Sequence, residues 1–257
     1  MRISKHRRWR GKRRRTKKKK QKGGRHYPMT CVSAFFNIKG KVVSRFTEWF
    51  PNTLAINCPY VFFGTKDTLE MIKTYRKDLP THYIEYNLDN FVTKKWKDKM
   101  TIDEFHCPSV DLNMVWNEKI YMLKMAAERN PFHSEWFQWV DAGTAAYREE
   151  KPPATEYPTI EKLAMLPKDK LTYSSSINYS DERPIHTINH HIAGTAYILH
   201  KDMIPKFADI YTKKMDDVHA EPGMWTDQIV LTHIYRDTPE LFFKIGDGYG
   251  DVTRKLY

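Results

Sequence analysis

The sequence lacks any apolar stretch of membrane-spanning length, and it contains few cysteines. Its longest apolar run, residues 192–199, spans eight of the 257 residues and includes a glycine and a threonine. A transmembrane helix needs about 20 apolar residues, so we expect no membrane span in this sequence. Cys31, Cys58 and Cys107 lie far apart, which gives neither a disulfide framework nor a Cys-x-x-Cys metal knuckle. Scattered thiols of this kind fit a reducing compartment, and we expect an intracellular protein.

Acidic residues are absent from the first 25 positions, which contain 15 of the 43 Lys and Arg residues. Residues 26–257 carry the other 28 and all 31 Asp and Glu residues, so the formal net charge of +12 comes from the N-terminal segment. Because this segment has so few apolar residues, we predict a disordered basic tail over residues 1–25. It would bind a polyanion, either nucleic acid or an anionic membrane surface. A nuclear-localisation signal and a solvated tail without a partner are the alternatives.

The rest of the chain has the composition of a globular protein. A hydrophobic content of 40% and an aromatic content of 14% exclude a chain that is disordered throughout. Strand-like runs alternate with helical periodicity, which predicts an α/β domain with a mainly parallel central sheet flanked by helices. We expect strands at residues 29–37, 60–63, 82–86, 136–140, 171–176 and 192–199. We expect helices at residues 67–75, 110–130 and 204–215, and a last helix that opens at Trp225 with Thr226 as its N-cap.

One expected strand delivers a carboxylate to its end. The strand at 136–140 is followed by Asp141, Ala142 and Gly143, and open α/β sheets bind ligands beyond the carboxyl ends of their strands. Asp141 is therefore a candidate ligand for a divalent cation, and the small residues after it would let a ligand approach the backbone. Alternatively, Asp141 is a turn residue that hydrogen-bonds its own backbone.

Three further features have both a functional and a structural interpretation. Asp227, in the first turn of the last helix, would orient an acceptor hydroxyl or accept its proton, but an acid there also favours the helix dipole. Lys119, beside the apolar stripe of the helix at 110–130, would point at a phosphate or lie at the surface. Three histidines lie within residues 186–191. No cysteine pair accompanies them, which favours a polar loop beside a binding site over a zinc site.

Several motifs occur in a set order along the chain. They are Arg76, W-N-E-K at 116–119, W-V-D-A-G at 139–143, A-G-T-A at 193–196, W-T-D-Q at 225–228 and G-D-G-Y at 246–249. In this order they resemble the HtrL/YibB-like family over about residues 30–250, and that family looks like a branch of the GT-A glycosyltransferases. The resemblance implies one GT-A-like, nucleotide-diphospho-sugar transferase domain over residues 26–257.

The resemblance also implies an activity. It implies a glycosyltransferase, of the hexosyltransferase type, that moves a sugar from a nucleotide-sugar donor to a hydroxyl group of a glycan or protein, assisted by Mn²⁺ or Mg²⁺. Asp141 would stand at the first Asp of a D-x-D motif and contact the metal or the ribose and diphosphate. Arg76 and Lys119 would hold the nucleotide, and Ala34 and Phe36 would border its base.

The acceptor side follows from the same resemblance. Gly194 would lie on the acceptor-side strand, and the catalytic residues Asp227 and Gln228 would face the anomeric carbon or the acceptor. Lys/Arg-rich arms that end in Gly-Gly are, in addition, similar to those on proteins of large DNA viruses, which would place the protein inside a host cell.

One departure from the pattern concerns the metal. Gly143 stands where the second Asp of D-x-D is expected, so a metal would need another ligand, either Asp247 or a histidine of residues 186–191. Without a metal, Lys and Arg would have to neutralise the diphosphate leaving group. Two other functions stay open, a catalytically inactive glycosyltransferase-like binding protein and a nucleic-acid-associated protein that acts through its basic tail.

Overall fold

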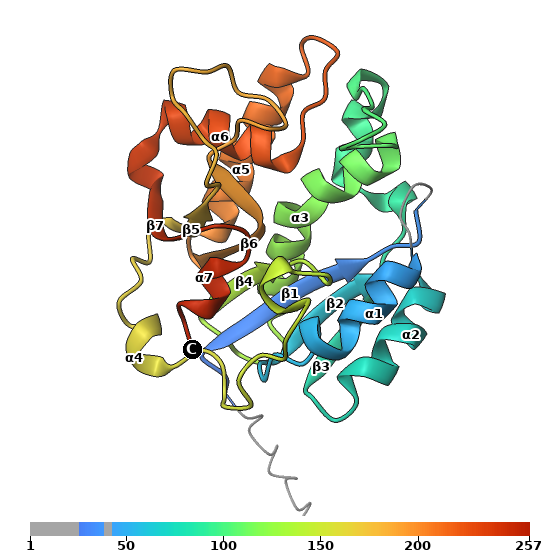
Figure 1. The fold of residues 1–257 in the computed structure, drawn as a ribbon, viewed down its shortest axis with the longest axis vertical. Coiled ribbons are helices and arrows are strands. Elements are labelled where there is room, and N and C mark those ends of the chain that lie inside the picture. The colour runs from blue at the N-terminus through green and yellow to red at the C-terminus, as the bar shows by residue number, and fades with distance from the viewer. Residues whose placement is uncertain (1–25, 39–42) are drawn as a thin grey trace, which may run out of the picture.

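One sheet organises the part of the chain that the computed structural model describes, residues 26–38 and 43–257. Its seven strands follow the order β3-β2-β1-β4-β6-β5-β7 (Figure 1). They are β1 (Met29–Phe35), β2 (Tyr60–Gly64), β3 (Thr81–Glu85), β4 (Trp136–Val140), β5 (Leu171–Ser175), β6 (Ile192–His200) and β7 (Phe242–Asp247). Among them only β6 is antiparallel to its neighbours, which confirms the predicted mainly parallel sheet. The tail predicted over residues 1–25 lies outside the described residues.

Helices cover both faces of this sheet. The first face packs against α3 (Val110–Arg129), α5 (Ile204–Val218) and α6 (Asp227–Asp237). The second packs against α1 (Val43–Thr53), α2 (Lys66–Arg76) and α7 (Asp251–Arg254). The short elements are α4 (Ile160–Leu163) and the 3₁₀ turns Leu88–Asn90, Val92–Lys99, Ala145–Tyr147 and Pro239–Leu241. Within the described residues, no helix combines the length and the apolar character that a bilayer span requires.

The strands bury both of their faces, which explains their nearly continuous apolar sequences. In β4 every position is buried. Phe137 and Trp139 point into the core beside α3, whereas Trp136 and Val140 point into the core beside α1 and α2. Because successive side chains of a strand point to opposite faces of the sheet, β4 contributes side chains to both cores.

The sequence analysis predicted neither β7 and α1 nor the four-residue helices α4 and α7. β7 lies at the edge of the sheet, where Phe243, Lys244 and Asp247 are exposed, so its apolar pattern is weak. α1 contains Pro51, which breaks a simple helical pattern. The reversed direction of β6 was not predicted either, because hydrophobic patterning does not encode strand direction.

α3 is buried on nearly every side, whereas the sequence predicted a single apolar stripe. The helix packs between the sheet and a layer formed by α5, α6 and Val92–Lys99. The positions that face away from the sheet are therefore covered as well. As a result, the polar and charged side chains that α3 buries are Asn113, Asn117, Glu118 and Lys119.

Glu118 shows what a buried side chain on the outer side of α3 does. Its carboxylate accepts hydrogen bonds from the backbone amides of Val92 and Thr93 at 3.1 and 3.0 Å. The hydroxyl groups of Tyr86 and Thr93 each donate to it at 2.8 Å. Burial raises the pKa of Glu118, and these hydrogen bonds oppose that rise. Glu118 thereby ties residues 86–93, which follow β3, to the centre of the fold.

Arg76 is fully buried at the amino ends of the strands. Its Nη atoms donate to three carbonyl groups at 2.8–3.0 Å, those of Leu54, Ile56 and Cys58. Its Nε donates to Thr81 Oγ1 at 3.0 Å. The guanidinium group therefore holds the connection from α1 to β2 against the end of α2 and supplies donors to carbonyl groups that are buried there.

We expect Arg76→Gln to lower the free energy of unfolding by about 3 kcal/mol, because each buried carbonyl group left without a donor costs roughly 1–3 kcal/mol. Urea denaturation of purified protein measures this change. Arg129→Gln, at an exposed position near the end of α3, is the matched control and should change the free energy by less than about 0.5 kcal/mol. Equal stability of the two variants would contradict the structural role of Arg76.

Candidate functional site

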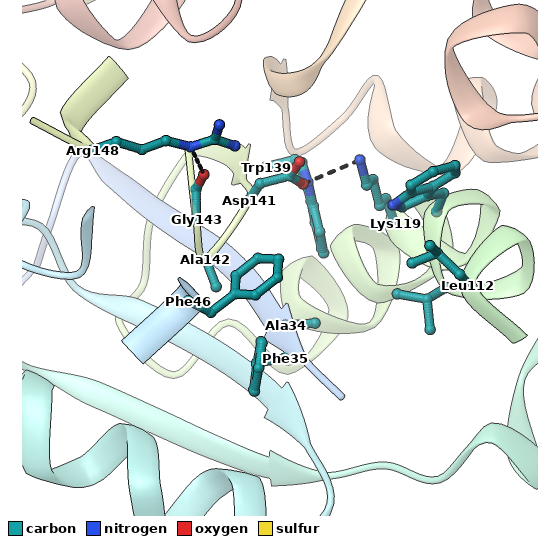
Figure 2. Close-up of a pocket in the computed structure, with 12 residues that line it drawn as sticks. Ala34, Phe35, Phe46, Leu112, Lys119, Trp139, Asp141, Ala142, Gly143 and Arg148 are labelled. Carbon is teal, nitrogen blue, oxygen red and sulfur yellow. Dashed lines mark hydrogen bonds and ion pairs between the residues drawn. The ribbon is translucent and has the colours of Figure 1, made fainter. Parts of the chain in front are cut away.

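A cavity of about 250 Å³ opens at the carboxyl ends of β1 and β4 (Figure 2). Ala34 and Phe46 contribute to one wall, from β1 and α1, and Leu112 contributes to another, from α3. Asp141 and Gly143, in the segment that follows β4, line it as well. This is the edge at which parallel strands present ligand-binding residues.

Two further cavities extend the first into a longer cleft. A small cavity of about 130 Å³ is lined by Lys119 and Asp141, which also line the first cavity. A larger one of about 690 Å³ shares Gln228 and Tyr249 with the small cavity. Trp116 lines all three. The three cavities therefore form one cleft that runs across the carboxyl edge of the sheet, with the small cavity in the middle.

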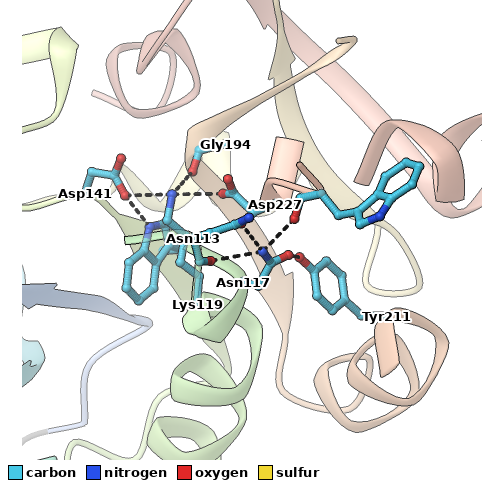
Figure 3. Close-up of polar contacts among 9 residues, drawn as sticks. Asn113, Asn117, Lys119, Asp141, Gly194, Tyr211 and Asp227 are labelled. Carbon is cyan, nitrogen blue, oxygen red and sulfur yellow. Dashed lines mark hydrogen bonds and ion pairs between the residues drawn. The ribbon is translucent and has the colours of Figure 1, made fainter. Parts of the chain in front are cut away.

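A buried lysine lies between two carboxylates at the centre of the cleft (Figure 3). Lys119 Nζ is 3.1 Å from Asp141 Oδ1 and 2.9 Å from Asp227 Oδ2. It also donates to the carbonyl oxygen of Gly194 at 3.0 Å. Trp139 Nε1 donates to Asp141 Oδ1 at 2.7 Å. The three partners of Lys119 come from the end of β4, from β6 and from the start of α6, so one ammonium group joins three separate elements to α3.

The members of this ion cluster differ in exposure. The side chains of Lys119 and Asp227 are 6% and 5% exposed, whereas that of Asp141 is 30% exposed. Burial lowers the pKa of Lys119, but the two carboxylates raise it by more, so the pKa is raised overall and the ammonium stays charged. Burial raises the pKa of Asp227, and Lys119 offsets this only in part. Asp141 is thus the more accessible of the two carboxylates, and Asp227 lines only the small cavity.

A second set of hydrogen bonds positions Asp227. Asn117 Nδ2 donates to the carbonyl oxygen of Trp225 at 2.8 Å, and Tyr211 donates to Asn117 Oδ1 at 2.6 Å (Figure 3). This fixes the backbone just before α6, so Asp227 begins the helix beside Lys119. Thr226 takes the predicted N-cap position, but its side chain makes no capping hydrogen bond and lines the largest cavity.

Gly194 allows α6 to lie directly against β6. A Cβ atom at this position would lie 2.6 Å from Asp227 Oδ2 and 2.8 Å from Gln228 Cγ. Both distances are shorter than van der Waals contact, so any side chain here would displace the carboxylate from Lys119. The glycine is therefore needed for the geometry of the ion cluster.

The segment 186–191 forms one side of the largest cavity. His190 lines that cavity, and its Nε2 lies 2.6 Å from the hydroxyl group of Tyr249. His191 Nε2 lies 2.6 Å from the hydroxyl group of Tyr173. Burial lowers the pKa of His190, and it lowers the pKa of His191 to about 4. Both imidazoles are therefore neutral near pH 7, and each is committed to a tyrosine.

Arg148 is a cleft residue that the sequence analysis missed. It lines the first and the largest cavity. Its Nε donates to the carbonyl oxygen of Gly143 at 2.9 Å, and its guanidinium group lies 3.9 Å above the ring of Trp49. Its position a few residues beyond Asp141 is the only signal in the sequence that could have drawn attention to it.

The structure brings most of the predicted site residues to the cleft. Those that line it are Ala34, Lys119, Asp141, Gly143, Gly194, Asp227 and Gln228. Phe36 does not line it, because β1 ends at Phe35 and the Phe36 ring packs against Phe91 with centroids 5.3 Å apart. Arg76 does not line it either, since its donors are used at the opposite edge of the sheet. A nucleotide in this cleft would therefore be out of reach of Arg76.

Asp247 is not brought beside Asp141. It ends β7, and β6 and β5 lie between β7 and β4. At about 4.8 Å per strand, the ends of β4 and β7 are roughly 14 Å apart, whereas oxygen ligands lie only about 2–2.6 Å from a shared metal ion. Asp247 instead accepts a hydrogen bond from Ser175 Oγ at 2.6 Å and pairs with Lys244 at 2.6 Å. The two predicted metal ligands thus cannot bind one ion together.

Lys119→Met should show how much the ion cluster contributes to the free energy of unfolding. Removal of the ammonium group leaves two close carboxylates without a counter-charge, which costs about 3–5 kcal/mol of unfolding free energy. Burial already raises the pKa of Asp227, and loss of Lys119 would raise it further. The folded variant would therefore bind more protons than the unfolded state at low pH. We therefore expect a large loss of stability at pH 8 and a smaller one at pH 5.

Urea denaturation at the two pH values measures both losses. Lys124→Met is the control on the same helix, because Lys124 forms a long, partly exposed pair with Asp209 at 3.9 Å, and it should change stability by less than about 1 kcal/mol. An equal loss for Lys119→Met at both pH values would show that the carboxylates do not depend on Lys119.

Comparison with solved structures identifies the fold. The structure is similar to mouse xyloside xylosyltransferase 1 in its apo form, with a TM-score of 0.52 and 11% identity over 84% of each chain. It also aligns with 4-diphosphocytidyl-2C-methyl-D-erythritol synthase from Anaerococcus prevotii, with a TM-score of 0.39 and 9% identity over 90% of this chain and 89% of the other. The first likeness shows that the sheet and its helices form a GT-A-like fold, as the motif order implied.

Comparison at the level of sequence gives the family. No curated protein matches the sequence. The family model described as "Bacterial protein of unknown function (HtrL_YibB)" matches residues 36–256, which include every motif of the cleft described above except the end of β1. The chain therefore belongs to the HtrL_YibB family.

Proposed function

We propose that this chain transfers a sugar from a nucleotide-sugar donor to a hydroxyl group of a glycan or protein acceptor. The observation that carries the proposal is the cleft itself. A cavity at the carboxyl edge of the sheet and a larger, more polar cavity meet at the Lys119, Asp141 and Asp227 cluster. A transfer between two substrates needs a binding region for each, and the two regions must meet where the groups react.

The 250 Å³ cavity suits the donor. Its apolar walls, which include Phe35 and Val115, offer surface for a flat base. Asp141 presents a carboxylate that can accept hydrogen bonds from sugar hydroxyl groups. Arg148 supplies a positive charge at the boundary with the next cavity. Arginine suits phosphate oxygens because its planar group donates two parallel hydrogen bonds.

The 690 Å³ cavity suits the acceptor. Gln228 and Tyr249 lie at its junction with the small central cavity. Phe105 and Ile188 contribute apolar surface and are 92% and 60% exposed. A sugar ring or an extended peptide can pack on such surfaces while its polar groups meet Gln228 and His190.

The chemistry would proceed at the central cavity. The acceptor oxygen forms a bond to the anomeric carbon, the bond from that carbon to the diphosphate oxygen breaks, and the acceptor proton is released. Asp227 begins α6 with a raised pKa, which would favour proton transfer or electrostatic support of the developing positive charge on the sugar. Gln228, the next residue, would orient the sugar or acceptor.

The likeness to a xylosyltransferase supports a transferase through the shared fold. The identity of the sugar, expected to be a hexose, and the use of Mn²⁺ or Mg²⁺ stay predictions.

Asp141→Asn should lower transfer or donor hydrolysis by about 100-fold or more, because it removes the charge that a ligand in the donor cavity meets. The fold should persist, since the amide keeps the shape of the side chain. Asp247→Asn, a carboxylate at another strand end of the same sheet edge, is the matched control and should keep wild-type activity. Wild-type turnover by Asp141→Asn would remove Asp141 from the site.

A thermal-shift screen with UDP, GDP and CMP sugars tests the proposal before the acceptor is known. A donor present at 100 times its Kd should add about 2.7 kcal/mol of stability. Stabilisation by a nucleotide sugar that is never hydrolysed or transferred would instead favour the inactive binding protein. No stabilisation by any donor, with or without Mn²⁺, would contradict a donor site.

A further inference from the structure

We propose that this chain binds the diphosphate of its donor without a divalent ion, with Arg148 as the neutralising cation and Lys119 in place of a metal between the two carboxylates. This inference rests on the proposed function. It concerns the D-x-D pattern in which Asp141 holds the first position and Gly143 the second.

The first observation is that position 143 has no room for a metal ligand. A Cβ atom on Gly143 would lie 2.9 Å from Cδ1 and Cε1 of Phe46 and 3.1 Å from Cε3 of Trp49. Two aromatic side chains of α1 thus occupy the space that a second carboxylate would need. The end of α1 is tied to the same segment, since Thr53 Oγ1 donates to the carbonyl oxygen of Ala142 at 2.5 Å.

The second observation is that no other carboxylate replaces the missing one beside Asp141. Asp247 is three strand positions away in the sheet. Asp227 is close, but its Oδ2 atom pairs with Lys119 at 2.9 Å and its side chain is only 5% exposed. An ion that bound Asp141 would therefore have one protein carboxylate, whereas divalent cations in proteins prefer several oxygen ligands.

The third observation is that a cation already lies between the carboxylates. Lys119 Nζ contacts three oxygen atoms at 2.9–3.1 Å, from Asp141, Asp227 and Gly194. The ammonium group thus makes one hydrogen bond and two ion pairs with these oxygen atoms. A divalent ion bound to Asp141 would lie close to this buried positive charge and would be repelled by it.

The fourth observation is that Arg148 is placed to bind the diphosphate in place of a metal ion. Its Nε atom donates to the Gly143 carbonyl oxygen, which holds the guanidinium group next to the position that the second Asp would have occupied. Figure 2 shows Arg148 extending over Gly143 on the same side of the cavity as Asp141. Within residues 26–38 and 43–257 its Nη atoms make no hydrogen bond, so they can donate to phosphate oxygens in a paired geometry.

Asp141 then has a different role from that of a metal ligand. A carboxylate without an intervening cation repels a diphosphate, so Asp141 would accept hydrogen bonds from ribose or sugar hydroxyl groups instead. The diphosphate would lie toward Arg148. The cleft thus separates recognition of hydroxyl groups from recognition of phosphate.

The test is the binding of sodium UDP, GDP and CDP and of their sugars to the wild-type chain, measured by calorimetry in EDTA and in excess MnCl₂. We expect at least one nucleotide to bind in EDTA with a Kd within about threefold of that in MnCl₂. Arg148→Gln should weaken this binding by about 10-fold or more, whereas Arg129→Gln should leave it unchanged. Electron paramagnetic resonance measures how much Mn²⁺ is bound. We expect the protein and nucleotide together to bind no more Mn²⁺ than the nucleotide binds alone.

Three other results would contradict part or all of this inference. Binding that requires Mn²⁺, or Mn²⁺ captured by the complex, would overturn this inference and leave the proposed transferase intact. Metal-independent binding that Arg148→Gln does not weaken would overturn the role of Arg148. Failure of all nucleotides and nucleotide sugars to bind in either condition would overturn the proposed function, and this inference with it.

Discussion

A buried ammonium group must be surrounded by oxygen atoms, and this requirement determines the geometry of the cleft. Lys119 lies on α3, and its three partners belong to the end of β4, to β6 and to the start of α6. Removal of Lys119 would leave two carboxylates without a counter-charge, at a cost of several kcal/mol. The four elements are therefore held in one arrangement before any ligand binds, which is the condition for electrostatic catalysis.

α3 can make these connections because it is covered on nearly every side around Asn117, Glu118 and Lys119. Successive side chains of a helix point about 100° apart. Four consecutive side chains therefore contact four different parts of the structure. In the W-N-E-K segment, Trp116 lines the cleft, Asn117 holds the backbone before α6, and Glu118 holds the segment after β3. Lys119 forms the ion cluster. Each member of the motif thus positions a different part of the site.

The strand ends show how far sequence patterns reach. The short runs at 136–140 and 60–63 agree with β4 and β2 to within a residue, because a strand buried on both faces is apolar at nearly every position. The end of β1 is less certain from sequence. Ala34 reaches the cleft, but Phe36 lies beyond the last paired residue and turns into the core against Phe91. A strand ends where its neighbours cease to pair with it, and that depends on other segments.

The sequence by itself determined the alternation of strands and helices, the carboxylate at the end of β4 and the order of motifs. These follow from local periodicity and from residue types a few positions apart. The tertiary structure alone decided that Lys119 faces inward between two carboxylates, that Arg76 serves the opposite edge, and that Phe46 fills the space beside Gly143. These contacts join residues far apart in the chain, so they depend on sheet order and helix packing, which local patterns do not encode.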